Sequence, residues 1–139
     1  MRPQMIERRT DITGLLSICT VVVDDDDAVR GAIADALRDS GYRVAEASSG
    51  EGALRRLERI PPAVLVSDVN LGPGMSGLEL AATVHKLWPA TGVLLVSADP
   101  GQFTGGEEFL SKPFSTDRFL RRVARIAERM RPSAGSGLL

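Results

Sequence analysis

The sequence predicts an α/β fold in which helices cover both faces of a parallel sheet. Short apolar runs alternate along the chain with segments whose apolar residues recur at helical spacing. Continuous apolar runs are typical of parallel strands buried on both faces, and their alternation with helices indicates right-handed crossover connections. A chain of 139 residues is long enough for one such domain and too short for two ordinary ones.

The first half of the chain contains two predicted strand and helix units. The first strand is expected at residues 18–23, and the helix after it ends at Ser40 and Gly41. The second strand is expected at residues 43–47, and its helix ends before Pro61. The buried face of that helix is predicted to comprise Ala53, Leu54, Leu57 and Ile60.

The third and fourth strands are expected at residues 63–67 and 92–96. Between them lie a Gly- and Pro-rich loop at residues 70–77 and a helix that ends before Pro89, because proline disfavours helical backbone in the residue before it. The predicted core residues of this helix are Leu78, Ala81, Val84 and Leu87.

A fifth strand is expected at residues 108–111, followed by an amphipathic helix capped near Ser115 or Thr116. Only residues 98–107 remain to cross from the fourth strand to the fifth. A parallel crossover takes about a dozen residues including its helix. The fourth helix is therefore expected to be abbreviated or missing.

Polar side chains stand where the predicted strands end. Asp24 and Asp25 follow the first strand, Asp68 the third, Ser97 the fourth and Lys112 the fifth. Because ligands of open parallel sheets bind at the carboxyl ends of the strands, these side chains are expected to share one site.

Three clustered carboxylates repel one another unless a cation lies between them, and Mg²⁺ prefers oxygen ligands. A carboxylate beside such an ion can act as nucleophile toward a phosphoryl group. In that chemistry Lys112 supplies a point charge for a phosphate oxygen, and Ser97 supplies a hydroxyl hydrogen bond.

The chain resembles the receiver domains of bacterial two-component response regulators over residues 18–130. The matching features are the acidic pair at Asp24 and Asp25, the Ser-Asp-Val-Asn sequence around Asp68, and the residues Ser97 and Lys112-Pro113. The resemblance implies a flavodoxin-like, doubly wound sheet of five parallel strands in the order 2-1-3-4-5, with helices on both faces.

The resemblance also implies roles for individual residues. Asp68 would accept a phosphoryl group from a phosphohistidine, assisted by Ser97 and Lys112, and the chain would not be an enzyme beyond its own phosphorylation and dephosphorylation. Mg²⁺ would be held by Asp24, Asp25, Asp68 and the main-chain carbonyl of Asn70. Ser97 and Phe109 would form the switch, and the peptide bond between Lys112 and Pro113 would be cis.

Composition and charge give expectations about surroundings and partners. A net charge of −1 gives no electrostatic reason to expect nucleic acid or an anionic membrane as partner, and a single cysteine fits a cytoplasmic protein. The expected organisation is an extension at residues 1–17, a receiver at 18–131 and a flexible tail at 132–139. A histidine kinase or histidine phosphotransferase would supply the phosphoryl group, and output would pass to a downstream protein, with a homodimer possible.

Alternative interpretations remain at this point. The run from Asp24 to Asp27 also suits a helix cap in which acidic side chains favour the helix N-terminus. Both roles are expected together, with Asp26 or Asp27 capping the helix while Asp24 and Asp25 reach the site. An aspartyl-phosphate hydrolase of the haloacid dehalogenase type would use similar chemistry, but it requires an Asp-x-Asp motif and a cap segment. A third possibility is an interaction module that is not phosphorylated. A stand-alone regulator and the receiver of a hybrid kinase fit equally well.

Overall fold

A parallel sheet of five strands forms the centre of the molecule in a computed structural model that describes residues 19–99 and 108–130. Its order is β2-β1-β3-β4-β5, and each neighbouring pair is parallel. The strands are β1 (Cys19–Val23), β2 (Arg43–Ala47), β3 (Val64–Asp68), β4 (Gly92–Ser97) and β5 (Glu108–Ser111). The predicted fold class and strand order are confirmed.

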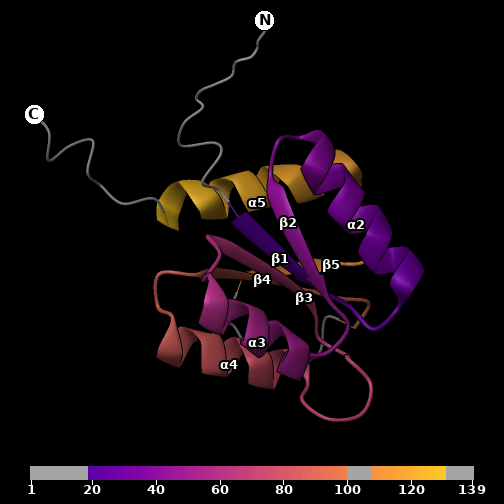
Figure 1. Ribbon diagram of the computed structural model, residues 1–139. Helices are drawn as coiled ribbons and strands as arrows, with labels where there is room; N and C mark the ends of the chain where they lie inside the picture. The colour runs from indigo at the N-terminus through magenta and orange to yellow at the C-terminus, as the bar shows by residue number, and fades with distance from the viewer. Residues whose placement is uncertain (1–18, 100–107, 131–139) are drawn as a thin grey trace, which may run out of the picture.

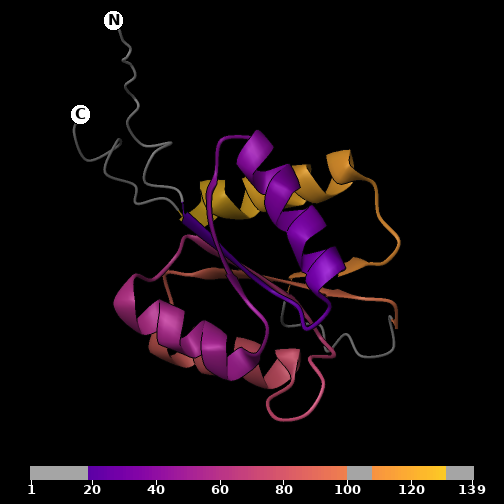
Figure 2. The ribbon, with the colours of Figure 1, turned by 45° about the vertical axis from the view of Figure 1, so that its right-hand side comes forward.

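Helices cover both faces of this sheet. They are α2 (Asp27–Asp39), α3 (Gly50–Arg59), α4 (Gly77–Leu87) and α5 (Thr116–Met130). Figure 1 shows α2 and α5 on one face and α3 and α4 on the other, and the turned view in Figure 2 shows the same three layers. This arrangement leaves the carboxyl ends of β1, β3, β4 and β5 at one edge, where the predicted site lies.

Short polar side chains start the helices by accepting hydrogen bonds from the first free backbone N–H groups. Asp26 caps α2, Ser49 caps α3, and Ser115 accepts from Arg118 N at the start of α5. Ser76 and Glu79 form a reciprocal capping box at the start of α4. The prediction that Asp26 or Asp27 would cap the first helix is therefore confirmed for Asp26.

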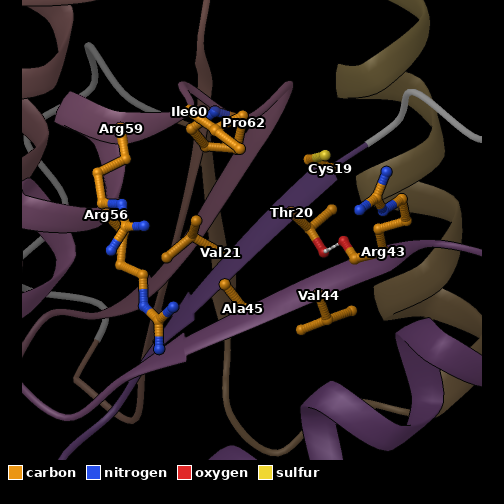
Figure 3. Close-up of a pocket in the computed structure, with 10 residues that line it drawn as sticks. All are labelled: Cys19, Thr20, Val21, Arg43, Val44, Ala45, Arg56, Arg59, Ile60 and Pro62. Carbon is orange, nitrogen blue, oxygen red and sulfur yellow. Dashed lines mark hydrogen bonds between the residues drawn. The ribbon is translucent and has the colours of Figure 1, made fainter.

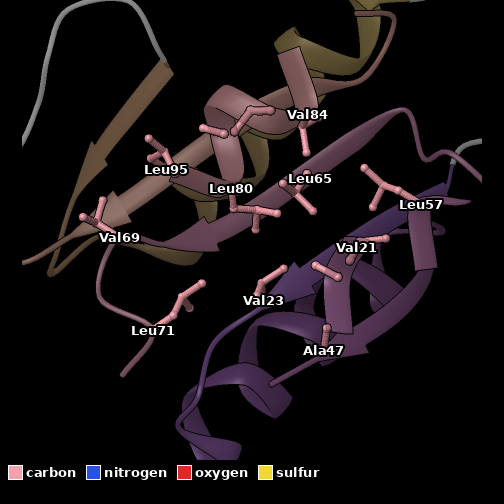
Figure 4. Packing of buried hydrophobic residues seen from close by; sticks show 13 residues of the cluster. Val21, Val23, Ala47, Leu57, Leu65, Val69, Leu71, Leu80, Val84 and Leu95 are labelled. Atoms are coloured by element: carbon pink, nitrogen blue, oxygen red, sulfur yellow. The ribbon is translucent and has the colours of Figure 1, made fainter. Parts of the chain in front are cut away.

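Each face of the sheet has its own hydrophobic core. Figure 4 shows the core on the α3 and α4 side, where Leu57, Leu80 and Val84 of the helices pack on Val21, Leu65 and Leu95 of the strands. On the α2 and α5 side, Leu37, Phe119 and Ile126 pack on Val22, Val66 and Leu94. The residues of β4 are buried throughout, as expected for an interior parallel strand.

The structure corrects two predictions of burial. Ile60 and Leu87 are 66% and 57% exposed rather than core residues. Ile60 is the C-cap of α3 and has extended backbone, so it does not continue the buried helical face, and Leu87 is the last residue of α4. Leu80, which the periodicity did not single out, is fully buried. Cys19, the first residue of β1, is partly buried.

Other predictions fall outside the part of the chain that the structure describes. They concern the extension at residues 1–17 and the tail at residues 132–139. The prediction of an abbreviated or missing fourth helix rests on residues 98–107, of which only the first two are described.

Candidate functional site

Three charged side chains from three strand ends meet at the carboxyl edge of the sheet. Lys112 Nζ lies 2.9 Å from Asp68 Oδ2 and 3.8 Å from Asp24 Oδ2. The strand order explains this contact, because β1 and β4 flank β3 and β5 follows β4. Lys112 therefore bridges two carboxylates that would otherwise repel each other.

Asp24 is the buried member of this group. Its side chain is 3% exposed, and its Oδ1 accepts a hydrogen bond from Asp26 N at 2.9 Å. Its Oδ2 is buried and accepts no hydrogen bond from the described residues. Burial, reinforced by the nearby carboxylate of Asp68, raises the pKa of Asp24 above its ordinary value of 3.8. Among the described residues this oxygen thus has an ion-pair contact with Lys112 Nζ at 3.8 Å but no hydrogen-bond donor.

Asp68 is the most accessible of the groups that contact Lys112. It is the last residue of β3, its side chain is 14% exposed, and its Oδ1 accepts from Asn70 N at 2.9 Å. The backbone around it is tightly packed, since Gly77 N donates to Val69 O at 2.8 Å. Asp68 is therefore held in place while one side remains open to a reacting molecule.

Lys112 is positioned by the strand beside Asp68. Its backbone N–H donates to the carbonyl of Ser97 at 2.9 Å, and the peptide bond to Pro113 is cis, which is the geometry that the resemblance implies. The hydroxyl of Ser97 is fully buried and accepts from Asp99 N at 3.0 Å. Ser97 directly follows Val96, which pairs with Asp68 in the register of β3 and β4, so Ser97 lies at the same edge of the sheet as Asp68.

Asp25 and Phe109 lie around this centre. Asp25 is exposed and leans toward the loop after β3, where a Cβ atom at Gly72 would lie 3.0 Å from its Oδ2. Gly72 has a φ of 79°, which glycine adopts without strain. Phe109 is partly buried against the core beneath α3 and α4.

The residues present fit a hard divalent cation, although within the described ranges no three acidic, His or Cys side chains converge closely enough to hold a metal by themselves. The observation in favour is the buried Asp24 Oδ2, which is without a hydrogen-bond donor. Mg²⁺ keeps several waters and needs only one or two protein carboxylates. Asp24 and Asp68 can supply those carboxylates.

Three residues that the sequence did not single out support the site. Arg30 Nη1 donates to the carbonyl of Asp24 at 2.8 Å, and Glu51 Oε2 accepts from Met75 N at 3.2 Å, which ties the loop after Asp68 to α3. Gly77 allows α4 to approach the backbone of Asp68. The Ser-x-x-Glu sequence from Ser76 to Glu79 was the available signal for the start of α4.

We expect Asp24→Asn to raise the free energy of unfolding by about 1 kcal/mol at neutral pH, because a buried carboxylate near Asp68 is replaced by a neutral group. The raised pKa of Asp24 means that the folded protein binds this proton more tightly than the unfolded chain does, so ionised Asp24 lowers stability above its ordinary pKa of 3.8. The gain should therefore shrink as the pH falls toward that value. Urea denaturation at several pH values measures it, and a variant less stable than wild type at pH 7 would contradict the argument.

Comparison with known proteins identifies relatives of this chain. The family model for the response regulator receiver domain matches residues 20–124. The chain is 34% identical over 116 residues to the transcriptional regulatory protein KdpE of Mycobacterium tuberculosis, a match that covers 78% of this chain and 50% of the relative. The response regulator protein FleR of Pseudomonas aeruginosa is 34% identical over 77% of this chain and 24% of its own length. The chain thus spans half or less of the length of these relatives. Because one of them is named a transcriptional regulatory protein, the expectation that nucleic acid is not a partner is not supported.

Solved structures show the same fold. A putative response regulator from Chloroflexus aurantiacus superposes with a TM-score of 0.74 at 32% identity, covering 80% of this chain and 98% of that one. The chemotaxis response regulator CheY4 of Vibrio cholerae gives a TM-score of 0.70 at 28% identity, covering 78% of this chain and 98% of the other. Within the described residues, no helix is long and apolar enough to cross a membrane.

Proposed function

Because the chain belongs to the response regulator receiver domain family, we propose that Asp68 accepts a phosphoryl group from the phosphohistidine of a histidine kinase or histidine phosphotransferase. Receiver domains are generally signalling domains rather than enzymes, and they interact with histidine kinases. The observation that carries the proposal is the accessible Asp68 carboxylate. It is held 2.9 Å from Lys112, beside a buried Asp24 oxygen that accepts no hydrogen bond from the described residues.

The chemistry requires one bond to form and one to break. An Asp68 carboxylate oxygen attacks the phosphorus, the P–N bond to the imidazole breaks, and the imidazole leaves with the bonding electron pair. Lys112, already within 2.9 Å of Asp68, is placed to neutralise a phosphoryl oxygen as the group arrives. The hydrogen bond from Asn70 N fixes the orientation of the attacking carboxylate.

Receiver domains generally bind Mg²⁺ for phosphorylation. In this chain Asp24, Asp25, Asp68 and the main-chain carbonyl of Asn70 would hold the ion, which when bound would neutralise charge on the transferring phosphoryl group. Asp24 is held in place by the hydrogen bond that its Oδ1 accepts from Asp26 N, and it directly follows the buried end of β1. Asp25 is exposed at the loop, so it would complete the site from the solvent side.

Signalling would follow from the new phosphoryl oxygens. Ser97 Oγ would give up the hydrogen bond that it donates to the carbonyl of Asp99 at 3.3 Å and donate to a phosphoryl oxygen instead, and Phe109 would repack against the neighbouring core. The receiver would comprise residues 18–131 and act in the cytoplasm. Its output would reach a protein target, a second copy, or a further domain of the kind that the longer relatives named transcriptional regulators suggest.

A small phosphodonor such as acetyl phosphate, added with Mg²⁺, should increase the mass of the full chain by one phosphoryl group. The modification should require the cation, because Asp24 and Asp68 otherwise repel the incoming charge. Intact-protein mass spectrometry measures the reaction, with a chelator as the control. Phosphorylation that is as fast with the chelator as with Mg²⁺ would contradict the proposed role of Asp24 and Asp68 in binding the cation.

A further inference from the structure

A groove that runs along the edge strand β2 carries a concentration of unpaired positive charge. It consists of two adjoining cavities of about 290 and 550 Å³ that share Arg56 and Arg59 of α3. Arg43 also lines the first cavity and Arg55 the second. We call this surface, defined by Arg43, Arg55, Arg56 and Arg59, the arginine groove.

None of these four arginines forms an ion pair with the described residues, whereas Arg30, Arg38, Arg122 and Arg129 all do. The one acidic residue that lines the groove, Glu46, is already bound by Arg30 and Arg38 from α2. The groove therefore holds four exposed positive charges, although the whole chain has a net charge of −1. Like charges gathered at a cleft without partners attract an anionic group.

The floor of the first cavity is largely apolar. Figure 3 shows Arg56 and Arg59 along one side of the first cavity and Arg43 at the other, with Val21 and Ala45 between them. Ile60, which is 66% exposed, and Pro62 close one end. This combination of an apolar floor and an arginine rim is the arrangement of a protein interface core, where arginine is enriched.

From these observations we propose that the arginine groove docks a short segment of a partner protein in which acidic and apolar residues alternate. Carboxylates of the segment would pair with Arg43, Arg56 and Arg59, and its apolar side chains would cover Val21, Ala45 and Ile60. A long polyanion fits less well, because Asp27, Glu51 and Glu58 are also exposed on α2 and α3 and would repel an extended row of phosphates. The surface is separate from Asp68, so the proposal does not depend on phosphorylation.

The test uses the full chain and a fluorescent peptide of alternating Asp and Leu at low salt. Control peptides replace Asp by Lys or Leu by Ser. We expect fluorescence anisotropy to detect binding of the Asp-Leu peptide but not of either control peptide. The double variant Arg56→Glu with Arg59→Glu should bind the Asp-Leu peptide about tenfold more weakly. The matched control reverses the charges of Arg121 and Arg125, two exposed arginines of α5 on the opposite face that form no ion pair with the described residues. It should change the affinity less than about twofold.

Cys19 provides a second readout, because it lines the first cavity and is the only cysteine in the chain. Bound peptide should slow its reaction with a bulky maleimide in proportion to occupancy. The separate variant Arg43→Glu, on β2, should weaken both the binding and this protection even if the α3 variant were poorly folded. Equal binding of all three peptides, unchanged affinity in the α3 variant, or stronger protection of Cys19 by duplex DNA than by the peptide would each overturn the proposal.

Discussion

Asp68→Asn should abolish phosphorylation of the chain by acetyl phosphate and Mg²⁺, leaving no phosphoryl mass increase above background. Asparagine preserves the volume of the side chain and can still accept the hydrogen bond from Asn70 N, but its amide oxygen is a poor nucleophile. Lys112 would lose its partner at 2.9 Å and retain only Asp24 at 3.8 Å. The expected loss is at least about a hundredfold in rate, since nucleophile and substrate positioning are removed together.

A matched variant separates this effect from a general loss of acidic residues. Asp39→Asn removes an exposed carboxylate at the end of α2 that has no ion-pair partner among the described residues. It should be phosphorylated at the wild-type rate. If the Asp68 variant were labelled as fast as the Asp39 variant, peptide mapping would have to place the phosphoryl group elsewhere, and Asp68 would not be the acceptor.

The grouping of polar residues at the strand ends was predictable from sequence, because it depends on one local pattern and on one property of parallel sheets. Apolar runs mark buried parallel strands, and parallel strands align their carboxyl ends. This is why Asp24, Asp68 and Lys112, separated by 44 residues or more between successive members, could be expected at one site, and the structure brings them together.

Contacts between elements were not predictable in the same way. The exposure of Ile60 and Leu87 depends on where each helix ends, which helical spacing does not report. The hydrogen bond between Glu51 and Met75 joins a helix start to a loop 24 residues away, and the approach of Gly77 to Asp68 depends on the angle of α4. Periodicity identifies a buried face but not its neighbours in space.

The site also shows why its residues do not maximise stability. Asp24 is buried with an oxygen that lacks a hydrogen-bond donor, and its pKa is raised by burial and by Asp68. Such an arrangement costs folding free energy, and the neighbouring Lys112 offsets only part of it. A cation that binds only the folded chain would recover stability by linkage. The same carboxylates that lower the stability of the fold are therefore those that make it respond to a charged ligand.

Gly77→Ala should destabilise the fold by about 3 kcal/mol and slow phosphorylation, because the new methyl group would be forced into the backbone of the acceptor strand. A Cβ at position 77 would lie 2.1 Å from the Asp68 carbonyl oxygen and 2.7 Å from Val69 Cα. Both neighbours are main-chain atoms, so a side-chain rotation cannot relieve the overlap. Helix α4 would have to move away from β3, which would stretch the hydrogen bond from Gly77 N to Val69 O.

Gly31→Ala provides the opposite control in the same protein. Gly31 lies inside α2, and a Cβ there meets no atom within 4 Å. Alanine should therefore stabilise the fold by about 0.5–1 kcal/mol through its higher helix propensity. Urea denaturation of both variants measures the contrast, and acetyl phosphate labelling shows whether the loss at Gly77 reaches Asp68. A Gly77 variant as stable as wild type would mean that α4 can shift freely, and that the close approach does not hold the acceptor loop in place.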